Sequence, residues 1–538
     1  MIVSGKLLDI HRREIYPAAV CLHDGHIEKI ERKKESADVY ILPGLLDAHV
    51  HIESSMLTPG EFARIAVTHG TIGAVSDPHE IANVLGVEGV NFMIENGNSV
   101  PFYFWFGAPS CVPATELESS GAVIGVNEVK QLLERKEIKY LSEMMNFPGV
   151  INEDEEVIKK ISEAKRNGKP VDGHAPGLRG KELEKYILKG ISTDHECSNL
   201  EEAREKIELG MKIIIREGSA ARNLESLKEL FNIYPEMLML CSDDIHPEMI
   251  MQRHINKLVA SLVCEGYDVF DVLKACSANT VKHYNLECGL IREGDSADFI
   301  IIDDIKRMNV LETWIRGEKV YSNGLVRFSA PGCRKINNFS CSEIGVKDIT
   351  VNPQTLRIRV IEATDGELLT TGITETVSGE GPIVSDTEKD ILKIVVKDRY
   401  NNSPPATGFI RGFGLKQGAF ASSVAHDSHN IIAAGTNDSD IVSAVNEIIR
   451  VKGGLSFADG ETIRSMELDI GGIMTNRPCG EVAAAYQELS YMVKSAGSRL
   501  SAPYMTLSFM ALLVIPELKI SDRGLFDGVK FEYTSLFV

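Results

Sequence analysis

Residues 42–55 of this chain read LPGLLDAHVHIESS, an apolar run that ends with His49 and His51 one residue apart. An imidazole is costly to bury without a partner, so two of them in one apolar segment need a reason. Residues i and i+2 of a β-strand point to the same face, and the two rings would therefore reach one point. A metal ion is one explanation, and two ordinary core or turn histidines are the other.

The segment from residue 42 to about residue 285 alternates short apolar runs with amphipathic stretches. The runs are rich in Val, Ile and Leu, which is typical of parallel strands buried on both faces. Eight strand–helix units of this length predict a (β/α)8 TIM-like barrel. An open doubly wound sheet is the alternative, but no glycine-rich phosphate loop follows the first strand. The runs are LLDAHVH, GTIGAVSDPHE, PFYFWFGAPS, IKYLSEMM, PVDGHAPG, GISTDHE, MKIIIREGS and EMLMLCSDD.

The flanks of this segment have a different character. Residues 1–41 and 286–328 read as short strands joined by turns with Gly, Asp and Asn, which predicts one small composite β-domain. Residues 330–345 are polar and punctuated by Gly, Pro and Asn, as in a linker. Residues 346–538 predict an additional C-terminal α+β domain. The expected fold class is therefore α/β, with a barrel at residues 42–285 and these two further domains.

Composition and charge restrict the classes of function. The chain has 538 residues, too many for one core, and a formal net charge of −20. This charge argues against a nucleic-acid or membrane-surface binder, because both partners are polyanionic. The sequence shows neither a signal-peptide layout nor a bilayer-spanning run, and its ten cysteines include no C-x-x-C pair. We therefore expect a cytoplasmic protein.

Residues that can bind metal gather at the ends of the predicted strands. In a barrel, the C-terminal ends of the strands converge on one pocket. Taken singly, each residue has a structural explanation, such as a loop cap or a salt bridge. Their joint occurrence at the same end of successive strands indicates one or two divalent transition metals. The residues are His49, His51, Asp77, His79, Glu143, His174, His195, Asp243 and Asp244.

Several motifs carry a resemblance to a known family. PGLLDAHVHIESS, SDPHEIANV, EMMNFPGV, DGHAPG, TDHE and SDDIHP together resemble the amidohydrolase superfamily, and within it the bacterial and archaeal adenine deaminase family. The likeness continues in AHDSHNIIAAGTND and MTLSFMALLVIPELKISDRGLFD, so it spans essentially the whole chain. It implies hydrolytic deamination of adenine to hypoxanthine and ammonia, in purine salvage or catabolism.

The resemblance also implies a ligand set for two ions. Manganese is the expected metal, with iron or zinc as alternatives. His49, His51 and one further ligand would hold one ion, and His174 and His195 would hold the other. Glu143 would bridge the two ions as a catalytic and metal-binding residue. Two bridged ions lower the pKa of water and supply hydroxide at neutral pH.

A strand-8 aspartate is expected to bind metal and to carry a proton from the attacking water to the leaving amine. Asp243 and Asp244 are adjacent and would point to opposite sides of an extended strand. The superfamily places this aspartate directly after Ser or Thr, which favours Asp243 because it follows Ser242.

Other polar residues near the strand ends are expected to bind substrate or to support the ligands. Turn caps and a surface salt bridge are the alternatives for them. His426 and His429 of the C-terminal domain are weaker candidates, for a cap of the barrel mouth or a further ion site, with surface turn histidines as the alternative. The substrate or support candidates are Asp77, His79, Glu80, Arg216, Ser219 and Asp244.

The fourth strand contains two candidates for the bridge between the metals. Lys139 and Glu143 lie four residues apart, which is about 13 Å along a continuous strand. Only one of them can therefore sit at the metal pair. Glu143 is nearer the C-terminal end, so the sequence predicts a glutamate bridge and not a carboxylated lysine.

Three hypotheses for function follow. The first is adenine deamination, with adenine as the small-molecule partner, no nucleic acid, no membrane, and a homo-oligomer of two or more chains. The second is another amidohydrolase acting on a cyclic amide, similar to dihydroorotase or imidazolonepropionase, since many chemistries share this barrel. The third is a metal-holding scaffold without turnover, which predicts a missing ligand or base; none is visibly missing.

Overall fold

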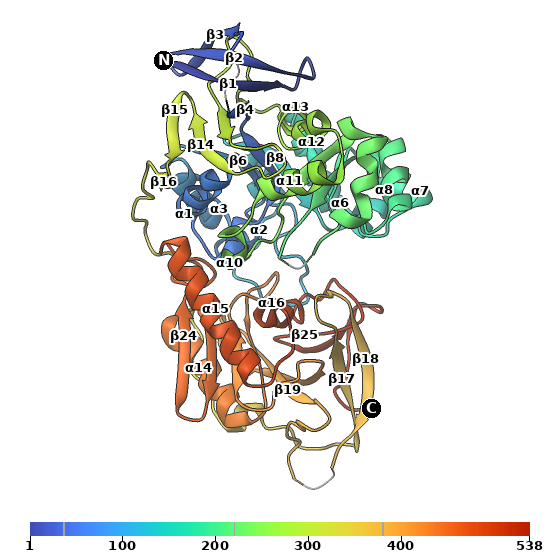
Figure 1. Ribbon diagram of the computed structural model, residues 1–538. Helices are drawn as coiled ribbons and strands as arrows, with labels where there is room; N and C mark the ends of the chain where they lie inside the picture. Colours follow the sequence, from blue (N-terminus) through green and yellow to red (C-terminus); the bar gives the residue numbers. More distant parts are fainter. Residues whose placement is uncertain (36–37, 220, 379–380) are drawn as a thin grey trace. The chain divides into compact units, whose positions relative to one another are not determined.

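The computed structural model describes residues 1–35, 38–219, 221–378 and 381–538 (Figure 1). The chain divides into two compact units, which are described separately below. Two short segments from within the predicted barrel range group with the C-terminal part, so the units interleave in sequence. The first unit is Met1–His79, Asn91–Cys111 and Ile124–Cys333, and the second is Glu80–Val90, Val112–Val123 and Arg334–Val538.

Parallel strands form the core of the first unit, and all eight predicted runs contain one of them. Five strands pair in the order β5-β6-β7-β8-β9, and three pair in the order β10-β11-β12. Parallel bridges from Val171 to Ile191 and from Val50 to Asp243 join the two sheets at both edges, which confirms the barrel. The strands are β5 (Leu45–Val50), β6 (Thr71–Ser76), β7 (Tyr103–Ala108), β8 (Ile138–Met144), β9 (Val171–Gly173), β10 (Thr193–Asp194), β11 (Lys212–Arg216) and β12 (Leu238–Cys241).

Amphipathic helices follow the barrel strands. In α6 (Glu155–Arg166), the side chain of Asp154 caps the helix by accepting a hydrogen bond from the amide of Val157. Val157, Ile161 and Ala164 are buried and recur three or four residues apart, as one apolar helix face requires. The bounds of α2 are His79–Leu85 and those of α3 are Val87–Gly97, and residues Glu80–Val90 of these helices group with the second unit. Further helices of the first unit are α1 (Pro59–Ala66), α4 (Val126–Leu133), α7 (Gly180–Leu188), α8 (Leu200–Glu208), α11 (Ile255–Glu265), α12 (Val269–Ala275) and α13 (Ala278–Tyr284).

The two flanks of the barrel sequence contribute to one eight-stranded sheet, in the order β16-β15-β14-β13-β4-β1-β2-β3. β4 pairs in parallel with β1 and antiparallel with β13, which ties the N-terminal flank to the segment after the barrel. Leu7, Ile41, Phe299 and Trp314 belong to its buried core. The strands are β1 (Ile2–Asp9), β2 (Glu14–His23), β3 (His26–Arg32), β4 (Tyr40–Pro43), β13 (Phe299–Ile302), β14 (Val310–Ile315), β15 (Glu318–Ser322) and β16 (Leu325–Val326).

Gly44 alone separates β4 from β5, the first barrel strand. A Cβ atom at this position would lie 2.4 Å from Cδ1 of Ile72 in β6, which is closer than side chains can approach. Close packing therefore requires glycine here. The small sheet and the strand that carries His49 are consequently one almost uninterrupted segment.

The second unit is built on another eight-stranded sheet, in the order β18-β17-β20-β19-β22-β21-β23-β24. α14 (Asp438–Val451) packs Ile441, Val445 and Ile448 against the apolar side chains of this sheet, which confirms the predicted α+β class. The strands are β17 (Arg357–Ala363), β18 (Thr370–Thr376), β19 (Leu392–Lys397), β20 (Ala406–Arg411), β21 (Ala419–Ser422), β22 (Ile431–Gly435), β23 (Gly454–Asp459) and β24 (Thr462–Glu467).

Two further helices, α15 (Cys479–Ser495) and α16 (Pro503–Phe509), precede a three-stranded sheet at the end of the chain. That sheet consists of β25 (Leu518–Ser521), β26 (Gly524–Asp527) and β27 (Glu532–Tyr533). Within the described part of the chain, no helix has both the length and the apolar character needed to cross a bilayer.

Candidate metal centre

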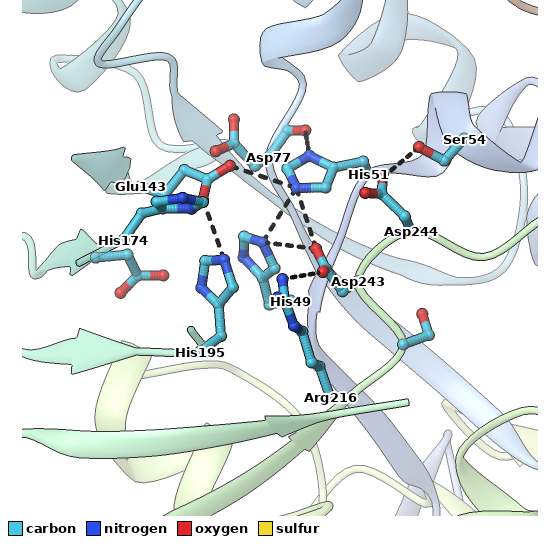
Figure 2. A network of polar contacts seen from close by, with 12 residues as sticks. His49, His51, Ser54, Asp77, Glu143, His174, His195, Arg216, Asp243 and Asp244 are labelled. Carbon is cyan, nitrogen blue, oxygen red and sulfur yellow. Dashed lines mark hydrogen bonds and ion pairs between the residues drawn. The ribbon is translucent and has the colours of Figure 1, made fainter. Parts of the chain in front are cut away.

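The C-terminal ends of the barrel strands place most of the predicted site residues in one cluster (Figure 2). All of these strands run parallel, so residues at or just beyond their last positions meet on one side of the ring. Nearly all of the side chains are buried, although they are polar or charged. The cluster contains His49, His51, Asp77, His79, Glu143, His174, His195, Arg216 and Asp243.

The two histidines of the opening motif face each other, as their spacing predicts. Nε2 of His49 lies 3.2 Å from Nε2 of His51. Oδ1 of Asp243 lies 3.5 Å from the first of these nitrogens and 3.4 Å from the second. Nδ1 of His51 lies 3.2 Å from the carbonyl oxygen of Asp77, which can only accept a hydrogen bond. The proton of a neutral His51 therefore resides on Nδ1, and its Nε2 presents a lone pair to the cluster.

Glu143 directs its two carboxylate oxygens to different histidines. Its Oε2 lies 2.8 Å from Nδ1 of His174 and 3.2 Å from Nε2 of His195. Its Oε1 lies 3.4 Å from Nε2 of His51 and 3.4 Å from Nδ1 of His79. One oxygen faces His174 and His195, and the other faces His51 and His79. A carboxylate that bridges two metal ions has this arrangement.

Asp77 and His79 lie at the edge of this cluster. Nδ1 of His79 is 3.2 Å from Oδ2 of Asp77, and the amide of His79 donates to Oδ1 of the same carboxylate. Both residues belong to a group of four potential ligands with His51 and Glu143. The geometry therefore brings these two substrate or support candidates within reach of a metal ion.

The distances between potential ligand atoms, called donors here because they would donate electron pairs to a metal, test whether the cluster fits a metal ion. Donors bound to one transition metal at about 2.0–2.2 Å lie roughly 3.0–3.6 Å from one another. Nε2 of His49, Nε2 of His51 and Oδ1 of Asp243 lie 3.2–3.5 Å apart, which meets this requirement. Without an ion, two imidazole nitrogens that face each other share at most one proton. A cation satisfies all three donors, so the residues fit a divalent metal.

Glu196 is a member of the cluster that the sequence did not single out. Its Oε1 lies 3.4 Å from Nε2 of His195 and 3.7 Å from Nδ1 of His174. Both of its oxygens accept hydrogen bonds from Arg216, in the two-bonded geometry that a guanidinium and a carboxylate favour. The available signal was its position directly after His195 at a predicted strand end.

Arg216 also bonds to Asp243, with Nη1 lying 2.7 Å from Oδ2 of the carboxylate. The guanidinium thus lies between two acids, Asp243 and Glu196. Arg216 therefore forms an internal ion pair, and not the surface salt bridge that was the alternative for this residue. Whether it orients substrate stays a prediction.

Asp244 and Ser219 lie beside the cluster and contact each other through the backbone. The Ser219 amide donates to the carbonyl of Asp244 at 2.8 Å. The Asp244 side chain accepts a hydrogen bond from the Ser54 hydroxyl at 2.5 Å. Asp243 thus directs one carboxylate oxygen between His49 and His51, while an oxygen of Asp244 is bonded to a serine.

Two carboxylates of the cluster, Glu143 and Asp243, have pKa values below their ordinary range. Burial alone would raise the pKa of Glu143, but His174 and His195 hold it well below its ordinary value. Burial would likewise raise the pKa of Asp243, but Arg216 and the facing histidines hold it well below its ordinary value. Ionised carboxylates are the form that metal binding requires.

The imidazoles respond in the opposite direction. Burial alone would lower the pKa of His174, but Glu196 and Glu143 raise it to about 9. Burial would also lower the pKa of His51, but Asp243 and Glu143 hold it well above its ordinary value. In the metal-free protein these rings therefore retain protons at neutral pH, and a metal ion must displace them.

Glu80, His426 and His429 form a separate cluster within the second unit. Oε1 of Glu80 lies 2.5 Å from Nδ1 of His426, and Oε2 lies 2.5 Å from Nε2 of His429. Burial alone would raise the pKa of Glu80, but the two histidines hold it well below its ordinary value. All three side chains are buried, so the alternative of surface turn histidines is wrong.

Comparisons with known proteins agree with this geometry. Residues 40–320 match the family model described as "Amidohydrolase family", and residues 367–532 match that described as "Adenine deaminase C-terminal domain". The chain is 50% identical over 539 residues to the adenine deaminase of Salinibacter ruber, covering 100% of this chain and 99% of that protein. It is 50% identical over 547 residues to the adenine deaminase of Methanosarcina mazei, covering 99% of each. It is 51% identical over 535 residues to the adenine deaminase of a Sulfurovum species, again covering 99% of each.

Proposed function

Because this chain belongs to the adenine deaminase family of the amidohydrolases, we propose that it hydrolyses adenine to hypoxanthine and ammonia at a centre of two divalent metal ions. One observation carries the site assignment. The two oxygens of Glu143 face different histidines, His174 and His195 on one side and His51 and His79 on the other. This is the arrangement that a pair of bridged ions needs.

The residues divide between the two ions. His49, His51 and Asp243 would hold the first ion, since their donor atoms converge at distances that fit one metal. His174 and His195 would hold the second, and Glu143 would contact both. When bound, the ions supply Lewis acidity that makes water a nucleophile at neutral pH.

Asp243 would move the proton. Its Oδ1 faces the donors of His49 and His51, and its other oxygen is fixed by Arg216. The carboxylate would accept one proton of water as the water oxygen bonds to C6 of adenine and the C6–N1 π electrons move to N1. It would return this proton to the exocyclic amino group as the bond from C6 to that group breaks, and the second water proton would end on N1 as the C6 carbonyl forms. Ammonia leaves and hypoxanthine remains. Because the pKa of Asp243 is low, the carboxylate is ionised at neutral pH, which is the form that can accept a proton.

Several finer properties belong to the same proposal. We propose manganese as the metal, because the resemblance to the family implies it, with iron or zinc as alternatives that suit the same imidazole and carboxylate ligands. A cytoplasmic location, a homo-oligomeric state and the division into barrel, composite β-domain and C-terminal domain are also proposed from the sequence. Asp77, His79 and Ser219 would bind substrate or support the ligands.

A comparison of substrates tests the proposal. Metal-free protein is reconstituted with Mn²⁺ and incubated separately with adenine, adenosine, cytosine and dihydroorotate, while ammonia release and ring opening are assayed. We expect ammonia from adenine, poor turnover of adenosine and no ring opening. Ring opening of dihydroorotate without deamination of adenine would support the cyclic-amide alternative. Equal turnover of adenosine and adenine would contradict the preference for the free base.

A further inference from the structure

A buried carboxylate that the proposed chemistry does not use lies in the same strand as the first metal ligands. Asp47 is fully buried in β5, two residues before His49. The pairing of β5 with β6 is irregular between Asp47 and Val50, so the contacts of Asp47, and not strand alternation, place its side chain. A buried ionised group without partners is unfavourable, so the contacts of Asp47 indicate what it does.

Asp47 accepts hydrogen bonds from three residues. Its Oδ1 accepts from the amide of Ser242 at 3.0 Å and from the amide of His49 at 3.4 Å. Its Oδ2 accepts from the hydroxyl of Ser242 and lies 3.0 Å from Nε2 of His254. Nδ1 of His254 is in turn 2.7 Å from the hydroxyl of Thr71, which fixes the ring. Both donors of Ser242 therefore converge on one carboxylate.

Ser242 immediately precedes Asp243, and the backbone turns sharply at that point. Asp243 has a φ of 53°, in the left-handed region that most residues avoid, just after β12 ends at Cys241. The Asp243 amide donates to the carbonyl of His49 at 3.0 Å. The unusual turn that aims Asp243 is thus tied to β5 from both sides, by Asp47 through Ser242 and by His49 directly.

We propose that Asp47 is a positioning residue that sets the distance between His49 and Asp243, two ligands of the first metal ion. One carboxylate spans strands from opposite ends of the barrel sequence, and its own position is fixed by His254. The inference rests on the metal-binding part of the proposed function, and it is independent of adenine as the substrate.

The bonding pattern explains why this position needs a carboxylate. An ionised aspartate offers only acceptors, and all of its partners here offer donors. Asparagine keeps one oxygen and replaces the other with a donor. His254 can adapt by changing tautomer, and the Ser242 hydroxyl can rotate. Asparagine is therefore expected to retain part of the positioning of Ser242, and alanine none of it.

Metal titration tests the role of Asp47 without any substrate. Metal-free wild type, Asp47→Ala and Asp47→Asn are titrated with Mn²⁺, and free Mn²⁺ is followed by electron paramagnetic resonance. Loss of a residue that orients a ligand costs about 10–100-fold in metal affinity. We expect Asp47→Ala to weaken one of two ions by this factor and to leave the other unchanged, with Asp47→Asn in between.

Asp298 provides a matched control. It is equally buried in the first unit and accepts hydrogen bonds from the Tyr103 hydroxyl and from the amides of Gly289 and Arg316. None of these partners belongs to the cluster of potential metal ligands. Asp298→Ala should therefore reproduce the loss of a buried carboxylate while keeping both Mn²⁺ affinities. Equal weakening by Asp298→Ala and Asp47→Ala would show a general loss of stability and overturn the proposal.

A double mutant tests the route through Ser242. Ser242→Ala should weaken the same ion less than Asp47→Ala, and it should add little in the Asp47→Ala background because the two act as a unit. Additive effects would contradict the proposal. If Asp47→Ala does not fold, Asp47→Asn decides, and unchanged affinity for both ions in that variant overturns it. Wild type that binds no Mn²⁺ would instead contradict the proposed metal centre.

Discussion

Nη1 of Arg216 lies 2.7 Å from Oδ2 of Asp243, while the other oxygen of this carboxylate faces the histidines of the first strand. The two oxygens therefore have different environments, one next to a fixed positive charge and one next to potential metal ligands. A charge held this close in a buried site stabilises the ionised form of the acid. The protonation of Asp243 consequently depends on Arg216.

Removing the charge of Arg216 should shift the pH dependence of activity. Because Arg216 lowers the pKa of Asp243, Arg216→Met raises that pKa, and the acid is then deprotonated only at higher pH. The acidic limb of the kcat/KM profile should move upward by roughly one pH unit, which is about a tenfold loss on that limb. Arg216→Lys retains a positive charge and should shift the limb less. An acidic limb at the same pH in wild type and Arg216→Met would contradict this coupling.

Asp243→Asn should separate metal binding from catalysis. The amide still offers an oxygen to an ion but cannot carry a proton between water and the leaving group. Acid–base catalysis contributes about 10²–10⁴ in rate, so kcat should fall at least about a hundredfold while much of the metal is retained. Metal content and steady-state kinetics are measured on the same preparations. Asp244→Asn is the matched comparison, and the assignment is wrong if only that variant loses activity.

The bridge between the ions should be independent of carbon dioxide. Glu143 is already an anionic ligand with two oxygens, and it directs one oxygen to each group of histidines. Reconstitution of metal-free protein with Mn²⁺ should therefore proceed equally with and without bicarbonate. Glu143→Ala should lose one or both ions, whereas Lys139→Ala should keep them. Activation by bicarbonate that disappears in Lys139→Ala would contradict the glutamate bridge.

Metal uptake should depend on pH through His174. Glu196 and Glu143 raise the pKa of this ring to about 9, so below that pH a metal ion must displace a proton. The sign follows directly: Mn²⁺ affinity increases with pH, by about tenfold per unit for one displaced proton, and levels off near pH 9. Glu196→Gln should lower the pKa of His174 and move the plateau to lower pH. Titration calorimetry in buffers of different ionisation enthalpy counts the released protons, and equal affinity at pH 7 and pH 8.5 would contradict the prediction.

The barrel and most of the cluster could be predicted because both follow local rules. A period of two placed His49 and His51 on one face, and parallel strands brought their last residues to one side. The spacing of Lys139 and Glu143 along one strand, with Glu143 nearer its C-terminal end, predicted which of the two joins the cluster. These patterns lie within a few residues of each other and need no knowledge of distant contacts.

Glu196 was missed because strand alternation stops where the strand stops. β10 ends at Asp194, so His195 and Glu196 lie in a turn in which neighbouring side chains can face the same cluster. The pairing of Glu80 with His426 was beyond prediction for another reason. It joins residues 346 positions apart, and no local periodicity encodes such a contact.

The single glycine between β4 and β5 couples the folding of the small sheet to that of the barrel while the chain is being synthesised. β4 lies between β1, which precedes it, and β13, which begins at Phe299, so one edge of β4 has no partner until the ribosome has passed the entire barrel. β5, the strand that carries His49, is joined through Gly44 to this incompletely paired strand. Asp243 also emerges long after His49. We therefore expect the nascent chain to acquire its metal late, in a slow step dominated by contacts between distant residues.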